Sequence, residues 1–526
     1  MRQPAFRKKT QGRQVSTPAS LPAPTGGWNT RDNLADMNEL YAASTDNWFG
    51  ETTDIRVRRG YADHVTGAGA AIETLMPYNS QDSTQTLFAA AGDSFYDVTS
   101  AGAIGSAVQG SLTNARWQYD NFTNSAGTSY LTCFNGADSP RYWNGSTWTT
   151  ITGASSPAIT GVTTTDIVNS FVFKRRMYLI LNNSLSLYYL PVDSVGGATN
   201  RTRLDGYFDR GGYIVAGGSW TLDGGDGIDD KLVVISSEGQ IAVFRGTNPS
   251  SSSSWALEGV WNVGEPIGRR CLIKKGGDLL ILTVAGLFPL SKALISSNDE
   301  KAVDESVSLT YNIEQSMRSS AEQYKTNYGW SMSYFPSGNQ LFLNVPVVEG
   351  SGQQQYVMNT TTSSWWRFTG VEANCWAVFN EDLYFGGATT VGKFGAVFAD
   401  NGEDIRTNMK QAFSYLGERG RLKQVKAMRP NFLANGIPSV SVAFAIDFGN
   451  QSPDTSLSFT PQSSGTWDSG TWDGGIWGGD VSGFNDWQTV GAVGTALSLR
   501  MISLTNGLDC RYTSSDILYE NGGVIG

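Results

Sequence analysis

The clearest pattern in the sequence is a pair of apolar runs joined by a tight turn. Residues 232–235 (LVVI) and 241–244 (IAVF) flank the segment SSEG at 236–239. Two such runs around a Gly-containing turn predict a β-hairpin. Nearly every position of both runs is apolar, so each strand is expected to be covered on both faces. Sheets that stack face to face, as the blades of a propeller do, cover their strands in this way.

The same hydrophobic unit recurs seven times along the chain. Its successive starts lie 43, 47, 54, 48, 62 and 42 residues apart, and periods of about 40 to 50 residues are typical of propeller blades. The repeat is degenerate and carries neither a WD nor a kelch signature, so the pattern leaves six or seven blades open. The units begin at Leu87, Tyr130, Met177, Lys231, Leu279, Leu341 and Leu383.

Two stretches show helical spacing instead. The first predicts a short helix capped near Asp32 that leads into the propeller, and the second a helix on the propeller rim capped by Thr310 or Asn312. For the second helix, packing against the blades is the plain interpretation and a contact between subunits the alternative. The apolar face of the first consists of Leu34, Met37, Leu40 and Tyr41; that of the second consists of Ile313, Met317, Ala321 and Tyr324.

The repeat stops near residue 402. A basic strand with Leu422, Val425 and Met428 is expected to end at Pro430, and residues 440–449 alternate as a strand whose partner is residues 496–504. These patterns predict a small antiparallel β-sandwich. The predicted organisation is therefore an extended basic arm (1–25), a β-propeller (26–402) and a C-terminal β-sandwich (403–526).

Within the last region, residues 465–479 (GTWDSGTWDGGIWGG) repeat a five-residue unit three times. The repeat places Trp467, Trp472 and Trp477 at equal spacing. Such a loop is expected either to pack on itself or to protrude as a docking surface for a neighbouring protein.

Composition narrows the class of protein. The chain has 526 residues, with 61 glycines and a 12% aromatic share, which fits many turns between packed strands. It contains neither an apolar run long enough to cross a membrane nor the apolar core of a signal peptide. The four cysteines are far apart and are expected to be buried free thiols of a protein assembled in a reducing cytoplasm. They are Cys133, Cys271, Cys375 and Cys510.

Charge divides the chain into an arm and a body. Residues 1–31 hold six basic and no acidic side chains, which leaves 32 basic against 48 acidic residues in 32–526, a net charge of −16. The arm is too polar to bury a core, so it is predicted to be disordered alone. It is either a solvated leader without a function of its own or an arm that orders against an acidic neighbour or nucleic acid. Its candidate contact residues are Arg2, Arg7, Lys8, Lys9 and Arg13.

Catalytic and metal-binding patterns are weak. His64 is the only histidine, which leaves little for a Ser-His-Asp triad or a multi-histidine metal site. The acidic stretch 223–230 (DGGDGIDD) departs from the EF-hand pattern and is interpreted as a turn rather than a calcium loop. TWDSGTW comes close to the Asp-box of sialidases but occurs once and outside the blades. No catalytic residue, metal or cofactor is predicted.

Three stretches in order along the chain resemble a family of bacteriophage proteins. They are GGWNTRD…DNWF…VRRGY within residues 26–61, DGGDGIDD…ISSEGQIAVFRGTNP…GRR within 223–270, and SYLGERGRLKQVKAMRP at 414–430. Together they are similar to the tail hub or nozzle propellers of short-tailed phages, also called packaged-DNA stabilisation or tail tubular B-type proteins. The resemblance covers about residues 26–430.

This resemblance implies a non-enzymatic virion protein, assembled in the bacterial host cytoplasm. It would form a hexameric ring below the portal and adaptor that retains packaged DNA and conducts it during ejection. Tail fibre, spike or needle proteins would be its distal partners. An acidic body lets DNA pass without adhering, and Glu238, Glu381 and Asp382 are candidates for turns at the channel or its rim. The rival classes are a propeller glycosidase, which needs paired carboxylates in a cleft, and a sugar- or peptide-binding propeller.

Overall fold

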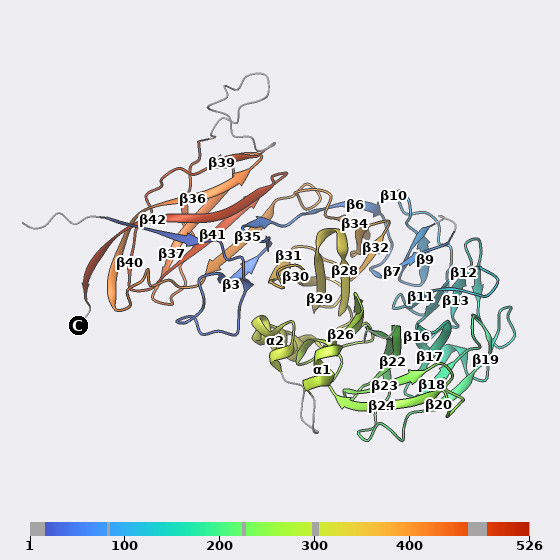
Figure 1. Cartoon of the computed structure of the whole chain (residues 1–526). Helices are drawn as coiled ribbons and strands as arrows, with labels where there is room; N and C mark the ends of the chain where they lie inside the picture. Colours follow the sequence, from blue (N-terminus) through green and yellow to red (C-terminus); the bar gives the residue numbers. More distant parts are fainter. Residues whose placement is uncertain (1–15, 82–84, 224–227, 297–304, 461–480, 525–526) are drawn as a thin grey trace, which may run out of the picture. The chain divides into compact units, whose positions relative to one another are not determined.

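The computed structural model describes residues 16–81, 85–223, 228–296, 305–460 and 481–524 (Figure 1). The chain divides into two compact units, which are described separately. Unit 1 consists of residues 1–27, 32–57 and 406–526, and unit 2 consists of residues 28–31 and 58–405. The predicted boundary near residue 402 lies close to the observed one. Residues 32–57, which the sequence placed in the propeller, belong instead with the C-terminal segment.

Unit 2 is a β-propeller of seven blades. Its first four blades are antiparallel sheets in chain order, with a two-stranded ribbon of β15 (Ile159–Thr160) and β19 (Gly197–Ala198) beside them. The blades are β7 (Ile72–Tyr78), β8 (Thr86–Ala91) and β9 (Ser94–Asp97); β11 (Gln118–Thr123), β12 (Ser129–Phe134), β13 (Arg141–Trp143) and β14 (Trp148–Thr150); β16 (Ile167–Phe173), β17 (Arg176–Leu181), β18 (Ser186–Tyr189) and β20 (Asn200–Arg203); and β21 (Ile214–Asp223), β22 (Ile228–Ser236), β23 (Gln240–Gly246) and β24 (Trp255–Asn262).

The last three blades complete the circle, and the seventh contains a strand from the start of the unit. They are β25 (Leu272–Lys275), β26 (Asp278–Thr283) and β27 (Gly286–Pro289); β28 (Ser331–Phe335), β29 (Gln340–Val348), β30 (Gly352–Asn359) and β31 (Trp365–Thr369); and β32 (Cys375–Phe379), β33 (Asp382–Gly386), β34 (Thr390–Phe394) and β6 (Tyr61–Thr66), with β10 (Gly102–Ala103) at the edge. Because β6 pairs antiparallel with β34, the two ends of the propeller are joined within one sheet.

The first strand of each blade lies innermost. β7, β11, β16, β21, β25, β28 and β32 contact one another in succession, and β32 contacts β7 again. Figure 1 shows the blades following one another around this circuit. The sequence left six or seven blades open, and the circuit settles the number at seven.

The seven predicted hairpin units are the second and third strands of the seven blades. In the unit from which the prediction started, β22 pairs with β23 and opposite residues such as Val233 and Val243 lie in register. Those two side chains enter one apolar cluster, whereas Leu232 and Phe244 enter the cluster on the other face. The prediction that both faces are covered is therefore confirmed, because alternate side chains fill the spaces on either side of the blade.

The predicted rim helix is present as α2 (Glu314–Tyr324), preceded by the 3₁₀ turn η3 (Tyr311–Ile313). Ile313, Met317 and Ala321 are buried among the blades, as the spacing predicts. No side chain caps the helix, because the hydroxyl of Thr310 accepts the backbone N–H of Leu287 instead. The sequence did not indicate a second helix, α1 (Leu290–Ser296); the remaining 3₁₀ turns are η1 (Thr164–Asp166), η2 (Glu305–Val307) and η4 (Pro336–Gly338).

Unit 1 is an antiparallel β-sandwich that draws strands from both ends of the chain. In one sheet the order is β39 (Ser482–Phe484), β36 (Arg421–Ala434), β42 (Cys510–Val524), β5 (Ile55–Val57) and β4 (Trp48–Gly50), with β1 (Thr17–Pro22) on β42 and β40 (Ala492–Gly494) on β36. In the other it is β3 (Tyr41–Asp46), β35 (Ile405–Gln411), β41 (Leu497–Thr505), β37 (Ser439–Ile446) and β38 (Thr455–Ser456). The short strand β2 (Gly27–Trp28) lies where the chain leaves this unit.

The predicted pairing of the segments at 440–449 and 496–504 is confirmed as β37 with β41. The two sheets approach closely at Gly494, where an added Cβ would lie 1.8 Å from Ile446. The basic strand does not end at Pro430, however, because β36 continues to Ala434. Along one edge of β36, β40 pairs with residues 423–425 and β39 with residues 432–434. Pro430 lies between these two segments, so its missing N–H interrupts neither pairing.

Two N-terminal predictions differ from the structure. Residues 33–40 form turns and not a helix, because the side chains of Asn33 and Asn38 accept the N–H groups of Ala35 and Leu40 and so compete with helical pairing. The arm was expected to be disordered through residue 25, yet Thr17–Pro22 is a strand paired with β42. The basic residues predicted to make contacts, Arg2 to Arg13, lie outside the described residues.

Candidate functional site: the axial cavity

The innermost strands of the propeller enclose a cavity of about 310 Å³, called here the axial cavity. Every blade contributes to its wall. The lining residues are Leu75, Gln118, Tyr119, Asp120, Asn169, Ser170, Phe171, Ala216, Gly217, Arg269, Arg270, Leu272, Ser331, Met332, Cys375 and Trp376. Gly217 is required here, because a Cβ at this position would lie 2.3 Å from the ring of Phe171 on the neighbouring inner strand.

Arg270 spans part of the axis and is well paired. Its side chain leaves blade five and donates from Nη2 to Thr74 Oγ1 at 2.9 Å and to the carbonyl of Trp117 at 2.9 Å, which belong to the first two blades. The same nitrogen donates to the hydroxyl of Tyr328 at 2.8 Å. Arg270 therefore ties three parts of the circuit together, and its donors are largely committed to the protein.

Arg269, the preceding residue, is not paired in this way. It is half-buried, and its Nη1 atom is buried without a hydrogen-bond partner in the described part of the chain. Its guanidinium carbon lies 5.8 Å from the ring centroid of Tyr213. Burial lowers the pKa of Arg269, but a guanidinium remains protonated near neutral pH. The axial cavity thus contains a positive charge that no carboxylate of the described residues pairs with.

A carboxyl group lies elsewhere in the same wall. Ser170 donates to Oδ2 of Asp120 at 2.5 Å. Burial raises the pKa of Asp120 to about 7, an effect that the Ser170 hydrogen bond only partly offsets. Burial also raises the pKa of the adjacent Tyr119 to about 12. Asp120 can therefore exchange a proton near neutral pH, whereas Tyr119 stays a neutral hydroxyl.

Ser331 supplies a second unsatisfied group. It begins β28 in blade six, is buried, and its Oγ has no hydrogen-bond partner among the described residues. Blades five and six are neighbours, and β25, which follows Arg269, contacts β28. The cavity wall therefore presents an unpaired cationic donor and an unpaired hydroxyl on adjacent inner strands, an arrangement suited to binding rather than to covalent chemistry.

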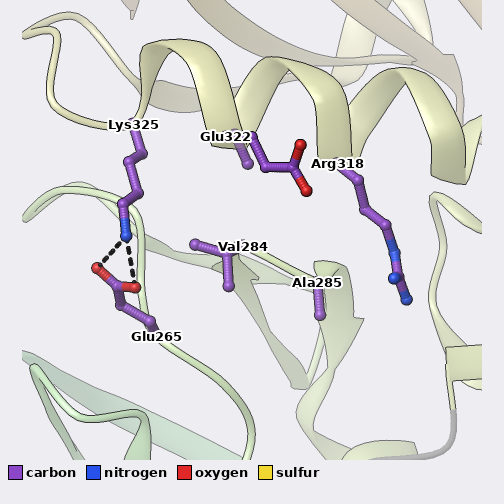
Figure 2. A pocket seen from close by; sticks show the side chains of 7 residues that line it. Glu265, Val284, Ala285, Arg318, Glu322 and Lys325 are labelled. Carbon is purple, nitrogen blue, oxygen red and sulfur yellow. Dashed lines mark hydrogen bonds and ion pairs between the residues drawn. The ribbon is translucent and has the colours of Figure 1, made fainter.

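A second pocket, of about 450 Å³, lies beside α2 and differs in character. Figure 2 shows Lys325 and Glu265 pointing toward each other across it, with Val284 and Ala285 on the wall facing the helix. Lys325 Nζ lies 2.8 Å from Glu265 Oε2, and Arg318 Nε lies 3.1 Å from Glu314 Oε1. The basic side chains of this pocket are already held by carboxylates.

The turns predicted for the channel of the ring, or for its rim, do not line the axial cavity of the propeller. Glu238 is exposed in the turn between β22 and β23. Glu381 and Asp382 occupy the turn from β32 into β33, and Asp382 pairs with Lys393 at 2.6 Å. None of them is among the residues that line the axial cavity. Trp467, Trp472 and Trp477 lie outside the described residues, as does Asp226 of the acidic turn.

Sequence reasoning did not identify the axial cavity. GRR at 268–270 belongs to one of the stretches that carry the resemblance, and its two arginines stand directly before the buried Cys271, an unusual place for two charges. The four cysteines are buried free thiols, as predicted. Cys375 lines the cavity, where burial raises the pKa of its thiol to about 11 and keeps it unreactive near neutral pH.

Within the described segments, no group of three or more His, Cys, Asp or Glu side chains is placed to hold a metal ion. None of the described helices is long and apolar enough to span a membrane.

Fold and site together define the class of protein, a seven-bladed β-propeller joined to a β-sandwich. No protein-family model matches the chain, and no curated protein matches it either. Among solved structures, the chain is similar to one described as YCF48 bound to D1 peptide. The identity is 11%, the match covers 66% of this chain and 95% of the other, and the TM-score is 0.34. We assign the class from the sheet topology and not from this similarity.

Proposed function

We propose that the protein is a structural subunit of a short phage tail. It would form a ring, expected to be hexameric, below the portal and adaptor of the virion, retain packaged DNA and conduct it during ejection. The proposal rests on three stretches that occur in the same order along the chain as in tail hub or nozzle propellers. It also rests on the position of one of them at the point where the propeller closes. Fibre, spike or needle proteins would dock at its distal end.

One observation carries the structural part of this proposal. The stretch VRRGY lies at the closing seam, defined here as residues 58–60, strands β6 and β34, and Asp400. Arg58 is buried and forms a bidentate pair with Asp400, at 2.8 and 2.6 Å, and also donates to the carbonyl of Thr369 at 2.9 Å. At Gly60 a Cβ would lie 2.0 Å from the carbonyl oxygen of Ala399. These residues close the blade circuit tightly, which suits a subunit that must resist deformation.

Any DNA path would lie between subunits and not through one propeller. A cavity of about 310 Å³ has room only for a small molecule, and Arg270 hydrogen-bonds from blade five to residues of the first two blades. A lumen formed by several copies is compatible with the net charge of −16 of residues 32–526, because an acidic wall does not neutralise phosphates and so does not bind them.

The competing enzymatic function has less support from the axial cavity. Asp120 is the one carboxylate among the residues that line it, whereas glycoside hydrolysis uses a pair of carboxyl groups. Electron microscopy of the purified chain mixed with its cognate portal–adaptor complex separates the two functions. The proposal expects a ring docked on the adaptor. A monomer that stays free of the complex, or that cleaves or binds glycans instead, would contradict it.

The basic arm offers a narrower test of assembly. We predict that deletion of residues 2–15 leaves the folded units intact and weakens docking to the adaptor or to a neighbouring subunit, since the arm supplies positive charge for an acidic partner. A deletion that reached residue 20 would also remove part of β1, which pairs with β42. Circular dichroism and docking measured for both deletions distinguish loss of the arm from loss of the strand. Unchanged assembly of the shorter deletion would refute the arm's role.

A further inference from the structure

The axial cavity contains an electrostatic imbalance that the proposed tail function does not explain. Arg269 brings a guanidinium to the wall, with Nη1 buried and unpartnered among the described residues. An unpaired buried charge is costly, and proteins normally compensate it with a partner charge and hydrogen bonds. In the same propeller, Arg58 has its carboxylate and Arg270 its four acceptors. Arg269 has only the ring of Tyr213 beside its guanidinium, and the residue lines the axial cavity.

The axial cavity is of a size and composition that suit a ligand. The volume of about 310 Å³ lies near the lower end of small-molecule sites, roughly 300–1,000 Å³. Its wall is partly apolar, through Leu272, Met332 and Trp376, with a few polar groups between. Ser331 lines the same wall, and its Oγ, buried and without a partner in the described part of the chain, keeps a hydrogen-bond donor unused.

The chemistry of these groups selects an anion. A guanidinium donates to carboxylate or phosphate oxygens through paired N–H groups, and a hydroxyl donor beside it adds to the preference. The lining residues comprise two arginines and one carboxyl group, Asp120, which accepts a hydrogen bond from Ser170. The fixed charge of the wall is therefore positive.

We propose that the axial cavity binds a small oxyanion, a carboxylate or phosphate, with Arg269 as its ion-pair partner and Ser331 as a hydrogen-bond donor. The site belongs to a single propeller, so it does not depend on ring assembly. Bound there, the anion would neutralise Arg269 and join blades five and six at the axis. It would thus act as a structural ligand that rigidifies the inner circuit of strands.

Isothermal titration of the full chain with inorganic phosphate and, separately, with citrate tests the proposal. Both titrations are made at constant ionic strength in a chloride buffer. At least one probe should bind saturably to one site per chain. Arg269→Gln should weaken that binding at least tenfold, and Ser331→Ala about threefold to tenfold, corresponding to the loss of one charged and one neutral contact. The stronger of the two probes identifies the class of anion.

The matched control is Arg203→Gln, which removes an arginine that is exposed and paired with Asp205. Its affinity should equal that of the natural chain. Arg269→Lys keeps the charge, loses the paired N–H geometry and should bind with intermediate affinity; it also serves if Arg269→Gln does not fold. Absence of saturable binding of both probes to the natural chain would overturn the proposal. Equal affinity for the natural chain and the Arg269 variants would do so too, because the anion would then bind elsewhere.

Discussion

At the closing seam the guanidinium of Arg58 is buried in protein. Both of its Nη atoms donate hydrogen bonds, to two backbone carbonyls and to the two carboxylate oxygens of Asp400. At the axial cavity the guanidinium of Arg269 is also drawn away from water, but Nη1 meets no acceptor among the described residues. The two regions belong to one propeller and use the same side chain. A buried arginine with its own carboxylate holds the fold together, whereas one without a carboxylate leaves a position for an anion from outside.

The largest expected effect comes from breaking the seam. Arg58→Met leaves Asp400 without its partner at the point where β6 joins β34, and we expect a loss of about 3–5 kcal/mol in the free energy of unfolding. Urea unfolding followed by tryptophan fluorescence measures it. The double variant Arg58→Met/Asp400→Leu should lose much less, since no charge is then left unpaired. A loss below about 1 kcal/mol in the single variant would show that the pair does not hold the seam.

Asp120 should produce the next largest effect, and one that depends on pH. Its folded pKa of about 7 lies above the value near 4 of an unfolded chain. Between these values the native state holds a proton that the unfolded state releases, so its contribution to stability falls as pH rises from 4 to 7 and stays low above 7. Asp120→Asn removes this dependence. The stability of the variant relative to the natural chain should rise by about 3 kcal/mol from pH 4.5 to pH 8.

Unfolding measured at several pH values checks the behaviour of Asp120. Asp205→Asn is the control, because Asp205 is an exposed carboxylate outside the cavity. Its stability relative to the natural chain should not rise with pH. If the difference between Asp120→Asn and the natural chain stayed constant from pH 4.5 to pH 8, the carboxyl of Asp120 would titrate normally.

How far the sequence could predict this molecule depends on the distance between partners. The hairpins β22–β23 and β33–β34 are local, and their alternating apolar residues sufficed to predict them. The seam is not local: Arg58 and Asp400 are separated by 342 positions, and neither flanking stretch indicates the other. The partner of β1 is equally distant, because β1 pairs with β42 near the other end of the sequence. The helix predicted at residues 33–40 was wrong for the opposite reason. The apolar spacing was helical, but local hydrogen bonds to asparagine side chains hold the segment in turns.

The axial cavity required the whole circuit of blades. Asp120, Arg269 and Ser331 are contributed by blades two, five and six, and in the sequence each is an ordinary polar residue in or before a strand. The periodicity predicted which strands are covered on both faces, but not which of their ends converge on the axis. Which charged side chains find partners at the axis depends on how all seven blades come together. The sequence of a single repeat does not show this.

A smaller effect, of opposite sign, is expected at Arg269. In a buffer without phosphate or carboxylates, Arg269→Met removes a charge that lacks a partner, and stability should stay the same or rise by about 1 kcal/mol. Thermal unfolding in chloride buffer measures this. Addition of citrate should then stabilise the natural chain relative to the variant. A loss of more than about 2 kcal/mol in chloride buffer would mean that the fold itself supplies a partner for Arg269, and the contrast with Arg58 would disappear.

The smallest expected effect concerns an ion pair that is exposed to solvent, and it provides a reference for the buried arginines Arg58 and Arg269. Lys325 and Glu265 hold each other across the pocket of Figure 2 with Nζ and Oε2 2.8 Å apart, and both side chains are more than two-fifths exposed, at 41% and 49%. Water and salt screen such a pair, so Lys325→Gln should cost less than about 1 kcal/mol. The cost should shrink further in 0.5 M sodium chloride, whereas the effect of Arg58→Met should persist because its pair is shielded from solvent. Urea unfolding of both variants at low and high salt makes the comparison. If the two losses responded equally to salt, burial would not be what distinguishes the seam from the surface.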